Sequence, residues 1–93
     1  MPKLIISQLR DRIRSLDYVV SIHAAEELND DNLTVLDLEN VILTGEIIER
    51  QRDRQTREVK CVVRGVTVDG LAAETIVKVG PTGRLVVITV YPV

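Results

Sequence analysis

The sequence predicts an α+β domain in which two to three N-terminal helices precede a four-stranded antiparallel β-meander. Apolar residues recur at helical spacing in the first half of the chain, and the period changes to two after Gly45. Turn signals then divide the second half into four short runs. A chain of 93 residues can bury one modest core. We therefore expect a single domain over residues 1–93.

The first helix is predicted over about residues 3–15. Pro2 suits a first helical turn because its missing N–H would be unpaired there in any case. The apolar stripe that follows consists of Ile5, Leu9, Ile13 and Leu16. Residues 17–20 are β-branched and aromatic apart from Asp17, and we expect a link or a brief extended segment there.

Two further helices are predicted from their caps. Ser21 can accept a free N–H of the first turn of a helix that ends in the polar turn 29–32. Thr34, with Asp37 three residues later, is the expected N-cap of a helix over residues 35–44. Gly45 is its expected C-terminal stop.

The strands are predicted over residues 46–52, from about residue 59 to 64, over 71–79 and over 84–91. Residues 53–56 and 80–83 are the expected turns between them. Gly65 is interpreted as a bulge. Asp69-Gly70 is a strong signal for a two-residue type I′ hairpin, which needs positive φ at both central residues.

The last strand is apolar on both of its faces. Helices can cover only one face of a small sheet, so Val86, Ile88 and Val90 need other cover. That cover comes either from helices that wrap round the sheet or from a partner. We therefore expect a homodimer through the last strand or a protein partner.

Composition narrows the classes of function. From residue 17 to residue 49 there are nine acids and no Lys or Arg, whereas the residues from Arg50 onward include eight basic residues and four acids. Such segregation can build a positive and a negative face on one domain. A merely solvated, charged surface is the plainer interpretation.

The aromatic and cysteine content excludes other classes. Without Trp or Phe, and with two Tyr, the chain lacks the platforms on which sheet-surface RNA readers stack bases. A single Cys61 forms no internal disulfide and alternates with Val59 and Val63 as a core residue. We find no signal peptide and no long apolar run, so we expect a cytoplasmic protein without a membrane segment.

His23 is the first candidate for chemistry near neutral pH, because histidine titrates there. A general acid or base and a phosphate contact are the functional interpretations, and a partly buried histidine bonded to a carbonyl is the structural one. The helix end disfavours imidazolium whereas Glu26 and Glu27 favour it, so its charge is left open. His23 and Glu27 share a helical face, but no HExxH or paired-cysteine spacing occurs, and no metal site is predicted.

The first hairpin is unusually basic. Within their strand, Arg50 and Arg52 are two residues apart and point to the same face. Lys60 and Arg64 are four residues apart and also share a face of their strand. Side chains on one face of paired strands can converge on a phosphate, to which guanidinium groups are well suited. A soluble hairpin with salt links to Glu49, Asp53 and Glu58 is the alternative.

Four motifs occur in order along the chain. They are Ile22-His23-Ala24-Ala25-Glu26-Glu27-Leu28, the helix end at Thr44-Gly45, the hairpin with Gly65 and Asp69-Gly70, and the closing Val87-Ile88-Thr89-Val90-Tyr91. From about Tyr18 onward the chain thereby resembles a small bacterial domain-of-unknown-function family. Its members begin with a helix carrying His-Ala and end in a strand reading like Ile-Thr-Val-Tyr.

That family is similar to RelE-like toxins and other small metal-independent ribonucleases. The resemblance implies a RelE-like fold, mRNA as the substrate, an antitoxin protein as the partner, and no cofactor. One position departs from the pattern, since many members have Arg where this chain has Glu27. An Arg there could bind phosphate, whereas a carboxylate repels it.

The implied chemistry is attack of a 2′-OH on the adjacent phosphate, which needs a base, an acid and cationic stabilisation. Our hypothesis makes His23 the base or acid, Glu27 the group that sets the imidazole, and Tyr91 the group that orients or protonates. The phosphate ligands would be Arg50, Arg52, Lys60 and Arg64. The alternatives are a non-catalytic interaction module that dimerises or binds a protein, and a degenerate toxin that keeps its antitoxin-binding surface.

Overall fold

The computed structural model describes residues 4–52 and 54–93. Pro2 and Lys3, at the start of the predicted first helix, and Asp53, in the predicted turn, lie outside these residues. The described chain forms three helices and five strands: α1 Ile6–Arg14, β1 Tyr18–Val20, α2 Ile22–Asp30, α3 Val35–Thr44, β2 Glu46–Arg52, β3 Val59–Val66, β4 Ala72–Val79 and β5 Leu85–Pro92. The predicted α+β class and its three helices are confirmed.

The sheet is five-stranded and mixed, with the order β1-β5-β4-β3-β2. β2 to β5 form an antiparallel meander, as predicted. The prediction of a four-stranded sheet needs correction because Tyr18–Val20 is a fifth strand, parallel to Leu85–Val87 of β5. The sequence predicts only a link or brief extended segment at β1, because three residues do not indicate which strand they pair with, and Leu85 is 67 positions after Tyr18.

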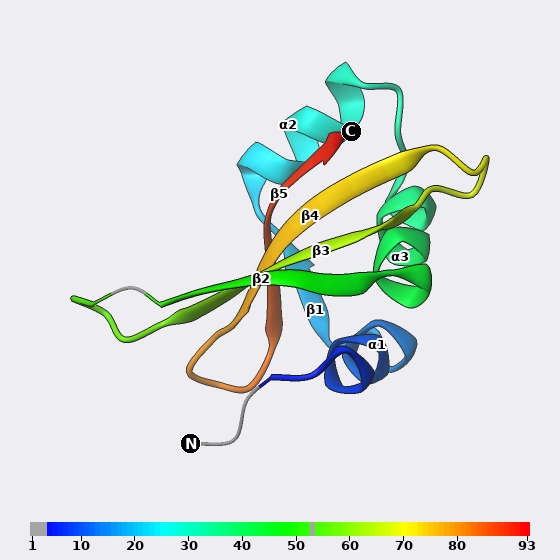
Figure 1. The fold of residues 1–93 in the computed structure, drawn as a ribbon. Coiled ribbons are helices and arrows are strands. Elements are labelled where there is room, and N and C mark those ends of the chain that lie inside the picture. The colour runs from blue at the N-terminus through cyan, green and yellow to red at the C-terminus, as the bar shows by residue number, and fades with distance from the viewer. Residues whose placement is uncertain (1–3, 53) are drawn as a thin grey trace.

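α1 and α3 pack on one face of the sheet, which we call the inner face, and α2 lies beside the C-terminal end of β5 (Figure 1). The opposite side is called the outer face. Buried inner-face residues of the sheet meet Leu9 and Ile13 of α1 and Leu38 and Ile42 of α3. The sheet contributes Cys61, Val63, Val77, Leu85, Val87 and Val90 to this core. None of the described helices has the length and hydropathy needed to traverse a lipid bilayer.

The helix ends follow from local chemistry. Ser21 Oγ accepts from Ala24 N at 3.0 Å, which confirms the predicted cap of α2. Thr34 N donates to Asp37 Oδ2 at 2.9 Å while Asp37 N donates to Thr34 Oγ1 at 3.3 Å. This reciprocal capping box fixes the start of α3, whose bounds are those predicted. α1 is shorter than predicted and begins after an Ile5 cap.

β5 contains a bulge at Ile88, between the pairs Ile76–Thr89 and Val77–Val87. An extra residue reverses the alternation of a strand. Val90 therefore shares the inner face with Leu85 and Val87 and is 1% exposed. Most of the apolar character of this strand is thus explained within the chain itself.

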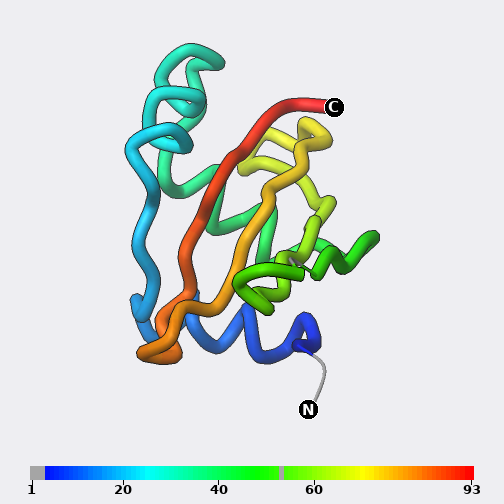
Figure 2. Tube along the Cα trace, turned by 90° about the vertical axis from the view of Figure 1, so that its left-hand side faces the viewer, coloured from blue at the N-terminus to red at the C-terminus, as the bar shows by residue number. Residues whose placement is uncertain are grey.

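β5 is also not a sheet edge. β1 pairs with Leu85–Val87, and α2 follows β1 along the remainder of the strand (Figure 2). Any contact between two copies through β5 would have to use its outer face, where Val86 and Ile88 are half-buried.

Gly45 and Gly65 let α3 approach the sheet closely. A Cβ at Gly65 would lie 2.1 Å from the carbonyl oxygen of Val41, and one at Gly45 would lie 2.4 Å from the same atom. Gly65 pairs regularly with Ala73, so the predicted bulge there is wrong. Its glycine is required by packing against α3.

The β3–β4 turn differs from the predicted type. Gly70 N donates to Thr67 O at 3.0 Å, and Thr67 N donates to Leu71 O at 2.8 Å. Gly70 has φ of 84°, and Asp69 has no positive φ. The loop is therefore a three-residue one in which a tight turn is followed by a left-handed glycine. This shifts the register by one residue and sets Arg64 opposite Glu74.

Candidate functional site

His23 lies in the first turn of α2, at the end of the sheet near the C-terminus. Ser21 fixes the helix there, because its N donates to Val87 O and its Oγ donates to Ile88 O, each at 3.0 Å. The His23 side chain is 68% exposed. The imidazole is thus an accessible group on an anchored helix start.

Glu27 connects this imidazole to β5. Its Oε1 lies 3.4 Å from His23 Nε2 and accepts a hydrogen bond from Val90 N at 3.0 Å. Thr89 Oγ1 donates to the same oxygen. The Glu27 side chain is 24% exposed, and its carboxylate accepts from Val90 N where β5 extends beyond its pairing with β1. The contact with Nε2 favours the tautomer that carries its proton there, leaving Nδ1 as an acceptor.

A second network crosses the outer face at the same end of the sheet. Tyr91 OH donates to Glu74 Oε1 at 2.7 Å, and Arg64 Nε donates to Glu74 Oε2 at 2.8 Å. Arg64 Nη2 lies 2.6 Å from that second oxygen. Glu74 is 8% exposed, yet both of its oxygens are bonded. Such pairing offsets the cost of burying a carboxylate.

These contacts shift two ionisation equilibria. The hydrogen bond from Tyr91, with those from Arg64, holds the pKa of Glu74 below its usual value, although burial opposes this. The bond to Glu74, with burial, raises the pKa of Tyr91. At neutral pH the network therefore comprises a carboxylate, a neutral phenol and a guanidinium.

The two networks are neighbours on the outer face. Thr89 and Tyr91 are two residues apart beyond the bulge, so both side chains point to the same side. We call the six residues the outer cluster: His23, Glu27, Arg64, Glu74, Thr89 and Tyr91. Four of the seven residues predicted from sequence thus lie at this end of the sheet as two separate pairs, His23 with Glu27 and Arg64 with Tyr91 through Glu74.

Lys60 is on the outer face but away from this cluster. It lies opposite Lys78 and Gln51, four positions before Arg64 on β3. That separation is about 13 Å along a strand.

Arg50 and Arg52 project to the inner face. Arg50 is paired with Cys61 and Arg52 with Val59, and residues directly opposite in a sheet share a face. The Arg50 guanidinium donates to Leu4 O at 3.0 and 3.3 Å. The convergence of these arginines with Lys60 and Arg64 therefore does not occur.

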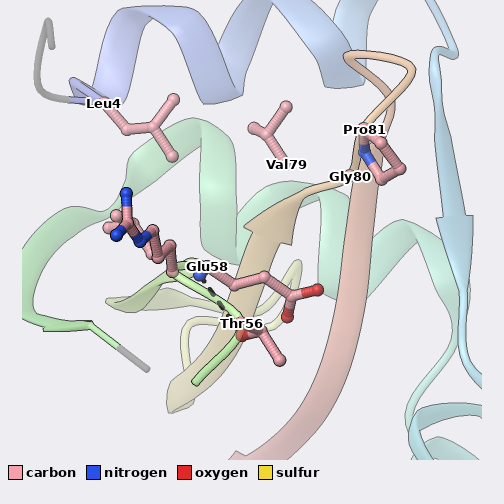
Figure 3. Close-up of a pocket in the computed structure, with 8 residues that line it drawn as sticks. Leu4, Thr56, Glu58, Val79, Gly80 and Pro81 are labelled. Atoms are coloured by element: carbon pink, nitrogen blue, oxygen red, sulfur yellow. Dashed lines mark hydrogen bonds between the residues drawn. The ribbon is translucent and has the colours of Figure 1, made fainter. Parts of the chain in front are cut away.

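These inner-face arginines lie beside a cleft of about 500 Å³. It is formed where the chain preceding α1, the β2–β3 turn and the β4–β5 turn meet (Figure 3). We call it the inner cleft. Its lining includes Leu4, Arg57, Glu58, Val59, Val79 and Pro81.

Sequence reasoning missed Glu74 as a site residue and gave Thr89 no role. Under the predicted two-residue turn, Arg64 would be opposite Thr75, so the acid that joins Arg64 to Tyr91 was not apparent. The position of Gly70 as the last residue of a three-residue loop is the signal that gives the correct register. No group of three or more His, Cys, Asp or Glu residues suited to a metal ion occurs in the described part of the chain.

The sequence matches a family described as a domain of unknown function (DUF4258) over residues 20–92. The chain belongs to this family. The resemblance to a domain-of-unknown-function family is thus confirmed. The DUF4258 match begins at the last residue of β1 and includes the whole outer cluster. No curated protein matches the chain, and no solved structure matches it.

Proposed function

We propose that this DUF4258 protein is a metal-independent endoribonuclease of the RelE-like toxin type, acting at the outer cluster. The observation that carries the proposal is the accessible His23 imidazole, 3.4 Å from a carboxylate that β5 holds in place. A base oriented by a fixed third group is the arrangement that general-base catalysis requires. The second network lies on the same face of the sheet, where Tyr91 follows Thr89 by two residues on β5.

In the proposed reaction, His23 Nδ1 takes the proton of a ribose 2′-OH. The freed oxygen attacks the adjacent phosphorus, and the bond from phosphorus to the 5′-oxygen breaks. The imidazolium returns its proton to that leaving oxygen, which yields a 2′,3′-cyclic phosphate and a 5′-hydroxyl. Glu27 fixes the orientation of the ring.

Arg64 would stabilise the charge that develops on the phosphoryl oxygens. Glu74 engages its Nε and Nη2, so the remaining guanidinium N–H groups are directed elsewhere, and its side chain is 52% exposed. Tyr91 is neutral and donates to Glu74, so its oxygen can still accept a hydrogen bond from a ribose hydroxyl or a water. Tyr91 is therefore proposed to orient the substrate rather than to protonate the leaving group.

The test is cleavage of a defined RNA by purified protein in the presence of EDTA. We expect His23→Ala to lower the rate by about 10²- to 10⁴-fold, the usual contribution of a general base. Glu26→Ala is the matched control, since Glu26 is exposed on the same helix. Circular dichroism would establish that both variants fold. Equal cleavage by the two variants would remove His23 from the mechanism.

A non-catalytic interaction module is the second candidate, favoured by exposed apolar residues near the β3–β4 turn. Val68 N donates to Asp37 Oδ1 at 3.1 Å, which brings the turn beside the first turn of α3. Leu36, Val68 and Leu71 are all exposed there. An antitoxin or a second copy of the chain would cover them. A stable complex by light scattering, with no RNA cleavage, would favour this candidate or a degenerate toxin over the enzyme.

A further inference from the structure

The inner cleft concentrates positive charge on a side of the molecule that the proposed chemistry does not use. Arg57 lines the cleft, and Arg52 is directly opposite Val59, another lining residue. Both arginines are exposed. Arg50 reaches the rim as well, since its guanidinium is bonded to the carbonyl of Leu4. Arg57 therefore lines the concavity, and Arg50 and Arg52 each contact or pair with one of its lining residues.

The lining between these cations is apolar. Leu4, Val79 and Pro81 lie along the upper part of Figure 3, above Glu58 and Thr56. The acid of the lining, Glu58, is bound by Lys78 Nζ at 3.0 Å, which neutralises its charge. The cleft thus combines an apolar surface with a net positive rim.

The backbone at Arg57 is also unusual. Its φ is 62°, in the left-handed region that a residue with a Cβ adopts only at an energetic cost. Residues held in such conformations are concentrated at binding and catalytic sites. Here the conformation belongs to a cation at the mouth of the cleft.

We propose that the inner cleft binds one nucleotide of single-stranded RNA, with its base against the apolar lining and its flanking phosphates at Arg52 and Arg57. A base can stack on a guanidinium plane and bury its flat face against an apolar lining, and guanidinium forms paired hydrogen bonds with phosphate. The volume is in the range of small-ligand sites. The inference rests on the proposed function, because RNA is the substrate proposed there. The cleft would hold the strand at a distance from the reacting phosphate.

The test is fluorescence anisotropy with a labelled single-stranded uridine octanucleotide and the full chain carrying His23→Ala, which prevents cleavage under the proposed mechanism. We expect Arg52→Gln and Arg57→Gln each to weaken binding roughly tenfold, about the effect of one charge-assisted hydrogen bond. Each should reduce the slope of log K against log salt by about 0.7, the value for one phosphate contact on a single strand.

Arg14→Gln is the matched control, because Arg14 is an exposed arginine at the end of α1. Pro81→Asp is a second, independent variant: Pro81 is exposed, and a carboxylate there should repel the strand without removing an arginine. Equal binding by all four variants would overturn the inference. If the wild-type chain cleaves RNA but the cleft variants bind the octanucleotide as tightly as the control, the inference about the cleft is overturned and the catalytic proposal stands. If the cleft variants bind more weakly than the control but the wild-type chain cleaves no RNA, the inference about the cleft is supported and only the catalytic proposal is overturned.

Discussion

The outer cluster and the inner cleft use charge in opposite ways. In the outer cluster, Glu74 is buried and both of its oxygens have partners, one from Tyr91 and one from Arg64. At the inner cleft, Arg52 and Arg57 are exposed beside an apolar lining. Paired, buried charges fix geometry, whereas exposed cations leave their hydrogen-bonding capacity for a ligand. We therefore expect changes in the buried Glu74 network to affect stability and changes at the inner cleft to affect binding.

The largest effect on stability is expected from Glu74→Ala, which leaves a guanidinium and a phenol without their shared acceptor. We expect the free energy of unfolding to fall by about 2–3 kcal/mol, as for hydrogen bonds to a charged group. Urea denaturation at pH 7 measures it. Glu46→Ala is the control, because Glu46 is an exposed acid opposite the same Arg64 and should change stability by less than about 0.5 kcal/mol. Similar losses in both variants would contradict the proposed importance of the buried network.

A smaller, pH-dependent effect is expected from Tyr91→Phe. The Tyr91 hydrogen bond holds the pKa of Glu74 below its usual value. A carboxyl with a depressed pKa stabilises the fold above its unfolded pKa, about 4.3 for Glu, and this contribution is lost as pH falls through the folded value. The substitution should therefore cost about 1–2 kcal/mol at pH 7 and progressively less below about pH 4. Urea denaturation of both proteins at pH 7 and pH 3 measures this loss of stability. An equal loss at the two pH values would show that the Tyr91 hydrogen bond does not act through the ionisation of Glu74.

The smallest effect on stability is expected from Arg52→Gln. Arg52 is exposed on an edge strand, so the free energy of unfolding should change by less than about 0.5 kcal/mol even if RNA binding weakens. The same denaturation experiment measures it. A loss greater than about 1 kcal/mol would make Arg52 a structural residue and would remove the contrast between the two regions.

Much of the fold could be predicted because its signals are local. The capping box at Thr34 and the stop at Gly45 gave both ends of α3, and the period of two after Gly45 gave the bounds of β2. Cys61 was expected in the core and is fully buried. Each of these depends on residues within a turn or two of one another.

The candidate site was predicted only in part, since it depends on register. The alternation of β3 separates Lys60 and Arg64 from Cys61, but only the pairing with β2 shows that Arg50 shares the side of Cys61. In the same way, one residue in the β3–β4 loop decides whether Arg64 meets Glu74 or Thr75. A sequence shows which residues of one strand share a face. Which residues of two neighbouring strands share a face is known only once the register between the strands is known.

The sequence by itself determined the three helices, the antiparallel meander and the placement of His23 in the first turn of a capped helix, because caps, turns and periodicity act over a few residues. The tertiary structure decided that Tyr18–Val20 joins β5, that Val90 faces the core, and that the predicted phosphate ligands separate onto opposite faces. These outcomes depend on contacts between residues far apart in the chain, and a shift of one residue reverses the direction of every side chain in a strand.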